Sequence, residues 1–212
     1  MFPKTEVAPT DYGFIIAHRH DEKDLTQWNV KHWLMPFYKL VSQIKAGAPV
    51  GGHAWVPIDD ENCLAYSYEW HPDRPLTEKE LESCGSWSWI HAENQTGSDR
   101  TVLNRTNEYL IDRELQRSGK SFTGIKGIGM QDTAMQESMG PIQDRTREHL
   151  GTSDIAIITV RNHLLKVLRD HKKEATPPSL DPVTYRVRST RFTSPSGLSL
   201  QEAVDTMVSP QP

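Results

Sequence analysis

The longest helical pattern in the sequence lies between Gly129 and His171, and it constrains the fold more than any other feature. Apolar residues recur at helical spacing after Thr152, and Gly151 before them is of the type that ends a preceding helix. The run Thr152-Ser153-Asp154 is typical of a helix N-terminus. The predicted core-facing stripe of this helix consists of Ile157, Val160, Leu164, Leu165 and Leu168. A helix with such a stripe needs a sheet or other helices to cover it.

A second helix is predicted just before it, from Gln131 to Met139, and it presents an unusual carboxylate. Asp132, Met135, Gln136 and Met139 fall at i, i+3, i+4 and i+7, so they share one face. A carboxylate beside two methionines must be solvated, paired or bound to a metal, because burying it alone costs too much free energy. The alternative is an aspartate near a helix N-terminus, where the helix dipole favours negative charge.

The part of the chain before these helices is rich in strand patterns. Aromatic and β-branched residues predict a strand over 12–18, and alternation predicts two more over 53–57 and 64–70 that are joined by a hairpin. Thr77 followed by Glu80 predicts a short capped helix. We expect no helix or strand over 1–10 and a loop with a short strand over 28–41. We also expect an edge strand over 185–188 and a flexible tail over 193–212.

These patterns predict one α+β domain over residues 1–212, in which a curved antiparallel sheet surrounds a long C-terminal helix. No internal repeat and no change of composition suggests a second domain. A chain of 212 residues is long enough to form its own core.

Composition excludes several classes of protein. The formal net charge of -4 argues against a nucleic-acid partner, which would favour a basic face. The mean hydropathy of -0.62 and the lack of a long apolar run argue against a membrane span. Cys63 and Cys84 are too few for a disulfide framework, and we expect reduced thiols in a cytoplasm. The two sequences that copy parts of nucleotide-binding loops, at 119–121 and 124–129, lack the required glycine spacing.

Four long stretches of the sequence are distinctive: TDYGFIIAHR (10–19), GGHAWVPIDDENC (51–63), NEYLIDRELQ (107–116) and QDTAMQESMGPIQDRTREHLGTSD (131–154). They resemble the C-terminal catalytic domain of Rieske non-haem iron oxygenases, in particular the phthalate 4,5-dioxygenase and phenoxybenzoate dioxygenase group. The resemblance spans nearly the whole chain and is far more specific than a short motif.

The resemblance implies a helix-grip fold and a mononuclear Fe(II) held by two histidines and one aspartate, and Asp132 matches that aspartate. It also implies an aromatic substrate, O₂, electrons from NAD(P)H through a reductase or ferredoxin and a [2Fe–2S] Rieske cluster, and a homotrimer or hexamer. Three side chains are candidates to line the substrate pocket: Trp55, Met135 and Met139.

This sequence departs from the family in two ways. The family's paired histidines are absent, and neither cysteine has a histidine at the spacing of a Rieske site. We therefore expect a fragment of an oxygenase subunit, whose activity requires the missing N-terminal region. His18 and His20 have the spacing to chelate a metal on one face of a strand, but they do not match the family's histidines.

Three functions are compatible with these patterns. The first is the catalytic domain of an oxygenase that hydroxylates or O-demethylates an aromatic acid or aryl ether. The second is a helix-grip module that binds an apolar ligand without iron. The third is a structural subunit whose partner chains bring the histidines and the Rieske domain.

Overall fold

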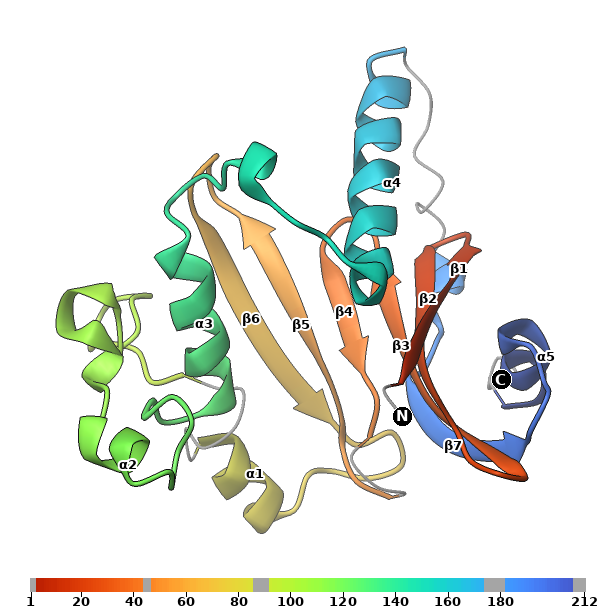
Figure 1. The fold of residues 1–212 in the computed structure, drawn as a ribbon, viewed down its shortest axis with the longest axis horizontal. Coiled ribbons are helices and arrows are strands. Elements are labelled where there is room, and N and C mark those ends of the chain that lie inside the picture. Colours follow the sequence, from red (N-terminus) through yellow and green to blue (C-terminus); the bar gives the residue numbers. More distant parts are fainter. Residues whose placement is uncertain (1–2, 44–46, 86–91, 174–181, 208–212) are drawn as a thin grey trace. The chain divides into compact units, whose positions relative to one another are not determined.

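The computed structural model describes residues 3–43, 47–85, 92–173 and 182–207 (Figure 1). The chain divides into two compact units. The first unit comprises Met1–Trp55 with Glu148–Pro212, and the second comprises Val56–Arg147. Each has a hydrophobic core of its own.

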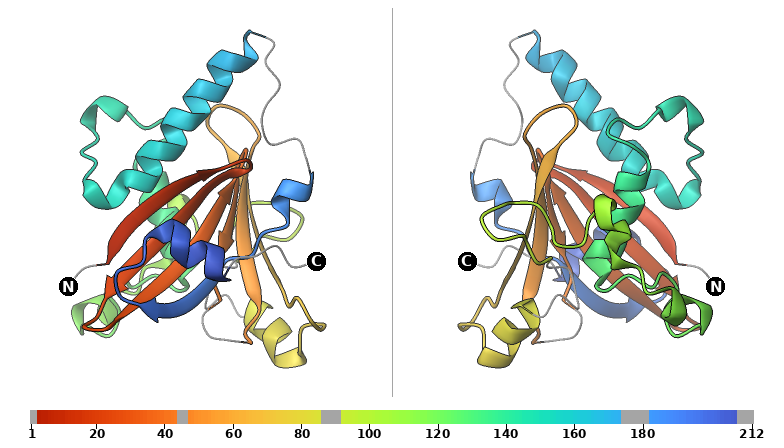
Figure 2. Two further views of the ribbon diagram at one scale, coloured as in Figure 1. Left: turned by 90° about the vertical axis from the view of Figure 1, so that its right-hand side faces the viewer. Right: turned by 90° about the vertical axis from the view of Figure 1, so that its left-hand side faces the viewer.

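A curved antiparallel sheet of seven strands is the main element of the fold (Figure 2). Strands β1 to β6 follow one another in sequence order, and β7 pairs with β3. Both β4 and β7 lie on the same edge of β3: β4 pairs with its last three residues, and β7 pairs with residues 25–30. The strands are β1 (Lys4–Thr10), β2 (Gly13–Asp21), β3 (Leu25–Leu34), β4 (Tyr38–Val41), β5 (Val50–Pro57), β6 (Cys63–Trp70) and β7 (Thr190–Pro195).

The strands predicted over 12–18, 53–57 and 64–70 are confirmed as β2, β5 and β6. Other predictions are wrong in whole or in part. Residues 4–10 form β1, and of the loop and short strand expected over 28–41, residues 28–34 instead belong to the long strand β3, while the short strand forms as β4. The edge strand expected over 185–188 lies five residues later, as β7, because Pro182–Tyr185 forms the 3-10 turn η4. Of the segment expected to be a flexible tail, residues 193–195 end β7, Leu200–Met207 form helix α5, and 208–212 lie outside the described residues.

Two helices of the first unit cover opposite faces of β1–β3. Helix α5 packs against one face, where Leu200, Ala203 and Val204 meet Trp28 and Val30. Helix α4 (Ile155–His171), which follows the 3-10 turn η3 (Thr152–Asp154), packs against the other face. Alternation of side chains along each strand produces both apolar faces, because successive residues point to opposite sides of a sheet.

The face of α4 that packs against the sheet is not the one predicted. Only Val160 of the five predicted residues packs against the sheet, where it lies with Ala156 and Val167. Leu165 and Leu168 remain 56% and 53% exposed. The ring of His163, which is not in the predicted stripe, makes edge contacts with Phe14 and Trp33 at centroid distances of 5.0 and 6.2 Å. The packing face is thus rotated by about one residue from the face of highest hydrophobicity.

The second unit is built around helix α3, which packs against the turn η1. Its core consists of Tyr109, Ile125, Met130 and Ala134. Besides strand β6, the elements of this unit are α1 (Glu78–Gly85), η1 (Arg105–Leu110), α2 (Arg113–Arg117), α3 (Ile128–Ser138) and η2 (Arg145–Arg147).

Candidate functional site

The predicted helix over 131–139 is confirmed as α3, which begins three residues earlier than expected. Gly127 precedes it with a φ of 81°, a left-handed conformation that suits glycine. The inner face of α3 is set by Met130 and Ala134, one helical turn apart, which enter the core. The hydroxyl of Tyr109 donates a hydrogen bond to the carboxylate of Glu137. These contacts fix which side of α3 faces outward.

Asp132 lies on the outward side of α3, in an exposed and largely apolar surface. Ile128, Met135 and Met139 share its face, and they are 44%, 68% and 54% exposed. The carboxylate of Asp132 makes no hydrogen bond or ion pair with any residue that the structure describes. Asp132 lies beyond the first turn of α3, where the helix dipole acts most strongly, so the dipole does not account for it.

Trp55, the third residue predicted to line a pocket, lies on β5 in the first unit. Its ring is 5.3 Å from that of His53, centroid to centroid, and the side chain is half-buried. A common pocket for Trp55, Met135 and Met139 stays a prediction.

The described residues contain no cluster of metal donors. Among residues 3–43, 47–85, 92–173 and 182–207, no group of three His, Cys, Asp or Glu side chains has the geometry to hold a metal ion. Asp132 therefore offers one donor of the right chemistry for Fe(II), and the described residues do not complete a set of three. His18 and His20 point to the same face of β2, as predicted, but their neighbours are cationic.

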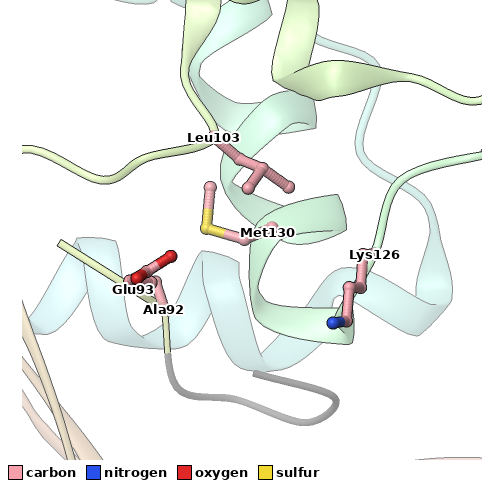
Figure 3. Close-up of a pocket in the computed structure, with 5 residues that line it drawn as sticks. All are labelled: Ala92, Glu93, Leu103, Lys126 and Met130. Atoms are coloured by element: carbon pink, nitrogen blue, oxygen red, sulfur yellow. The ribbon is translucent and has the colours of Figure 1, made fainter. Parts of the chain in front are cut away.

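The cavity beside α3 is too small for an organic substrate. Figure 3 shows Met130 pointing toward Leu103, with Ala92, Glu93 and Lys126 around them. The volume of this cavity is about 10 Å³, which is room for a single water molecule. An aromatic substrate would need a space more than ten times larger.

Sequence reasoning missed a buried polar pair in the first unit, because the residues of β3 were expected to form part of a loop and short strand. His32 is fully buried, and its Nδ1 lies 2.6 Å from the hydroxyl of Tyr12. Its Nε2 lies 3.2 Å from the carbonyl oxygen of Arg188. A carbonyl can only accept, so Nε2 carries the proton and Tyr12 donates to Nδ1. Burial lowers the pKa of His32 to about 4, which keeps the imidazole neutral.

Comparison with known protein families shows to which family the chain belongs. Residues 3–196 match the family described as LigXa C-terminal domain like, so one family domain includes residues of both compact units. The chain belongs to this family. The resemblance to oxygenase subunits of aromatic dioxygenases is thereby confirmed.

Two curated relatives of this LigXa C-terminal-like chain are oxygenase subunits. The chain is 33% identical over 197 residues to the 3-chlorobenzoate-3,4-dioxygenase oxygenase subunit of Comamonas testosteroni, which covers 87% of the chain and 46% of that protein. It is 41% identical over 115 residues to the phthalate 4,5-dioxygenase oxygenase subunit of Pseudomonas putida, which covers 53% of the chain and 25% of that protein. The chain thus spans half or less of the length of these relatives.

No helix in the part of this LigXa C-terminal-like chain that the structure describes has both the length and the apolar composition to cross a membrane.

Proposed function

We propose that this chain is the catalytic-domain portion of a Rieske non-haem iron oxygenase that acts on an aromatic acid or aryl ether. In the complete enzyme, electrons from NAD(P)H reach a mononuclear Fe(II) through a reductase or ferredoxin and a [2Fe–2S] cluster. The reaction is ring dihydroxylation or O-demethylation with O₂. The chain's similarity to two dioxygenase oxygenase subunits supports this class of reaction.

The observation that carries the proposal is the unpaired carboxylate of Asp132. A solvated carboxylate of no function is common on a helix, but Ile128, Met135 and Met139 share this face with Asp132 and Gln136, and all three are exposed. An exposed apolar surface with a single ionisable group at its centre is typical of a binding site. Asp132 also matches the carboxylate that the family uses as an iron ligand.

In this proposal Asp132 supplies the one anionic ligand to the iron, and two histidines from outside the described residues supply the neutral ligands. Iron with open coordination positions activates O₂ when it is bound. The residues of this chain hold the carboxylate in place: Met130, Ala134 and the Tyr109–Glu137 hydrogen bond fix the rotation of α3 about its axis. Met135 and Met139 offer an apolar surface to an aromatic ring, and Trp55 is a further candidate for the same pocket.

The fold and assembly follow from the same family. We propose a helix-grip fold, which is supported by the packing of the 17-residue helix α4 against one face of the antiparallel sheet. We further propose a cytoplasmic enzyme that assembles as a trimer or hexamer, in which each subunit receives electrons from a reductase or ferredoxin.

The decisive experiment measures iron in a complete oxygenase subunit that contains this domain. We expect Asp132→Ala to lose most of its iron and its turnover, while the circular dichroism spectrum and the Tm change little, because the side chain is exposed and unpaired. Asp99→Ala is the matched control, since Asp99 is also an exposed aspartate and lies in a loop. Full iron stoichiometry with normal turnover in Asp132→Ala would refute the assignment.

The runner-up function is a module that binds a ligand without iron, and the same measurement separates the two. The lack of a complete set of three donors among the described residues favours this alternative. A complete subunit that holds no iron and still binds an apolar ligand would establish it.

A further inference from the structure

A second, larger concavity lies in the first unit, on the sheet face that α4 covers only in part. Its volume is about 380 Å³, and it is open to solvent. Most of its lining comes from strands β2, β3 and β7, which pair with one another in that order. The lining residues are Pro3, His18, His20, Gln27, Trp28, Asn29, Arg191, Phe192 and Thr193.

The strand register brings polar side chains together in rows across this groove. His18 pairs with Asn29, and Asn29 pairs with Arg191, so one row crosses all three strands. Residues that oppose each other in an antiparallel sheet point to the same face. The next row is His20, Gln27 and Thr193. The apolar residues Phe14, Ile16 and Trp33 continue the same face under α4, so the face is divided into an apolar half and a polar half.

The groove is cationic although the chain as a whole carries a net charge of -4. Arg191 contributes a full positive charge, and its Nε donates to the hydroxyl of Ser42 at 3.4 Å. With the amide of Asn29 turned so that its nitrogen donates to Ser42, the amide oxygen accepts from Nη2 of Arg191 at 3.1 Å. These neutral partners orient the guanidinium without neutralising it.

Lysine side chains extend the positive charge beyond the lining. Lys31 lies two residues after Asn29 on β3 and thus on the same face. Burial lowers the pKa of Lys31, and the nearby charges of Lys39 and Arg191 lower it further. Burial also lowers the pKa of His18, and Lys31 and Lys39 add to the effect. Such mutual repulsion is relieved when an anion enters.

Acidic groups are scarce around this cluster. No Asp or Glu belongs to the lining, and no carboxylate lies within ion-pair distance of Arg191 or Lys31 among the residues that the structure describes. The nearest carboxylate in the hydrogen-bond network is that of Glu22, which accepts from Nε2 of Gln27 at 2.6 Å. The positive charge also argues against a metal at His18 and His20, because a cation would be repelled by Arg191 and Lys31.

We propose that this groove binds a small oxyanion, a carboxylate or a phosphate, through Arg191 with help from His18, His20 and Lys31. Arg191 takes the anion in a two-pronged contact, since a guanidinium matches the geometry of both groups. The imidazoles donate from the β2 side of the groove. The proposal is independent of the iron site, because every residue in it belongs to the first unit.

Titration of the chain with sodium benzoate and with inorganic phosphate at low ionic strength tests the proposal. Binding can be followed by calorimetry. We expect saturable binding that Arg191→Gln weakens about tenfold or more, with a smaller loss in Lys31→Gln. Tighter binding of benzoate would identify a carboxylate as the ligand, and tighter binding of phosphate a phosphorylated compound.

Arg186→Gln is the matched control, because it removes the same charge from an exposed position outside the groove. An equal loss of affinity in Arg186→Gln and Arg191→Gln would show that the loss comes from the change in net charge alone. That result would overturn the proposal. So would the absence of saturable binding of either anion. Arg191 is exposed, and circular dichroism checks that its variant is folded. None of these results depends on iron, so they are separate from the test of Asp132.

Discussion

The buried pair of His32 and Tyr12 predicts how the stability of the chain depends on pH. In the folded chain the pKa of His32 is about 4, chiefly because of burial, although its hydrogen bond to the Arg188 carbonyl opposes the shift. In the unfolded chain it returns to about 6.5. Between these two values the unfolded chain binds a proton that the folded chain does not bind. Stability is therefore lost as the pH falls from about 6.5 toward about 4.

The size of the effect follows from the difference between the two pKa values. Relative to pH 7, protonation of the unfolded state costs the folded state about 2 kcal/mol at pH 5 and about 3 kcal/mol at pH 4. A domain of this size has a total stability of roughly 5–15 kcal/mol. One histidine thus removes a large fraction of the stability within three pH units. No ion pair joins His32 to a carboxylate in the described part of the chain to offset it.

Urea unfolding at several pH values between 7 and 4.5, followed by circular dichroism, measures this loss. Burial also lowers the pKa values of His18 and His163, so the wild-type chain alone does not isolate His32. His32→Gln does, because glutamine can donate to the Arg188 carbonyl and accept from Tyr12 but does not titrate. We expect His32→Gln to be less stable than wild type at pH 7 and to lose about 2 kcal/mol less by pH 5.

His149→Gln serves as the control, since His149 is exposed, and its curve should follow that of the wild type. If His32→Gln and the wild type lose stability in parallel as the pH falls, His32 is not the group that titrates. The assignment of a neutral, buried imidazole would then be wrong.

Two further predictions concern the backbone. Gly13→Ala should cost about 2 kcal/mol or more in the free energy of unfolding, because φ is 146° and the added Cβ would lie 2.3 Å from the carbonyl oxygen of Trp33. The control Gly97→Ala, with open space at its Cβ, should cost about 1 kcal/mol. Equal losses of the two variants in urea unfolding would contradict the clash at Gly13. Glu108→Gly should raise stability by up to about 1 kcal/mol, because Glu108 has a φ of 51° in the left-handed region. Glu114→Gly, within helix α2, should lower stability by about 1 kcal/mol, and a loss in both variants would argue against strain at Glu108.

Elements whose hydrogen-bond partners all lie within a short stretch of sequence were predicted correctly. The short helix predicted after Thr77 forms as α1, with the backbone N–H of Thr77 donating to Glu80 at 2.8 Å. The hairpin between β5 and β6 forms as predicted, with the Asp59 carboxylate accepting from the backbone of Glu61 and Asn62. Both depend on residues within four positions of one another, so the sequence alone specifies them.

Strands that are held by partners distant in the sequence were not predicted correctly. Strand β1 carries few strongly apolar residues, and it is held by pairing with β2 over seven positions. Strand β7 lies about 160 residues from β3, its partner, so its register could not be predicted from neighbours in sequence. The groove of His18, Asn29 and Arg191 depends on this register. The family resemblance and the face that Asp132 shares with two methionines were enough to choose it as a candidate ligand. Its exposure could not be predicted from the sequence.

The rotation of α4 shows why periodicity identifies a helix more readily than its buried face. The sheet offers large side chains to α4, those of Phe14 and Trp33, and close packing requires smaller groups or flat rings opposite them. Ala156, Val160 and the ring of His163 meet this requirement, and a row of leucines does not. The leucines turn away although their transfer from water would release more free energy per residue. Shape complementarity with the sheet therefore sets the direction of α4, and hydrophobicity along the helix sets only its existence.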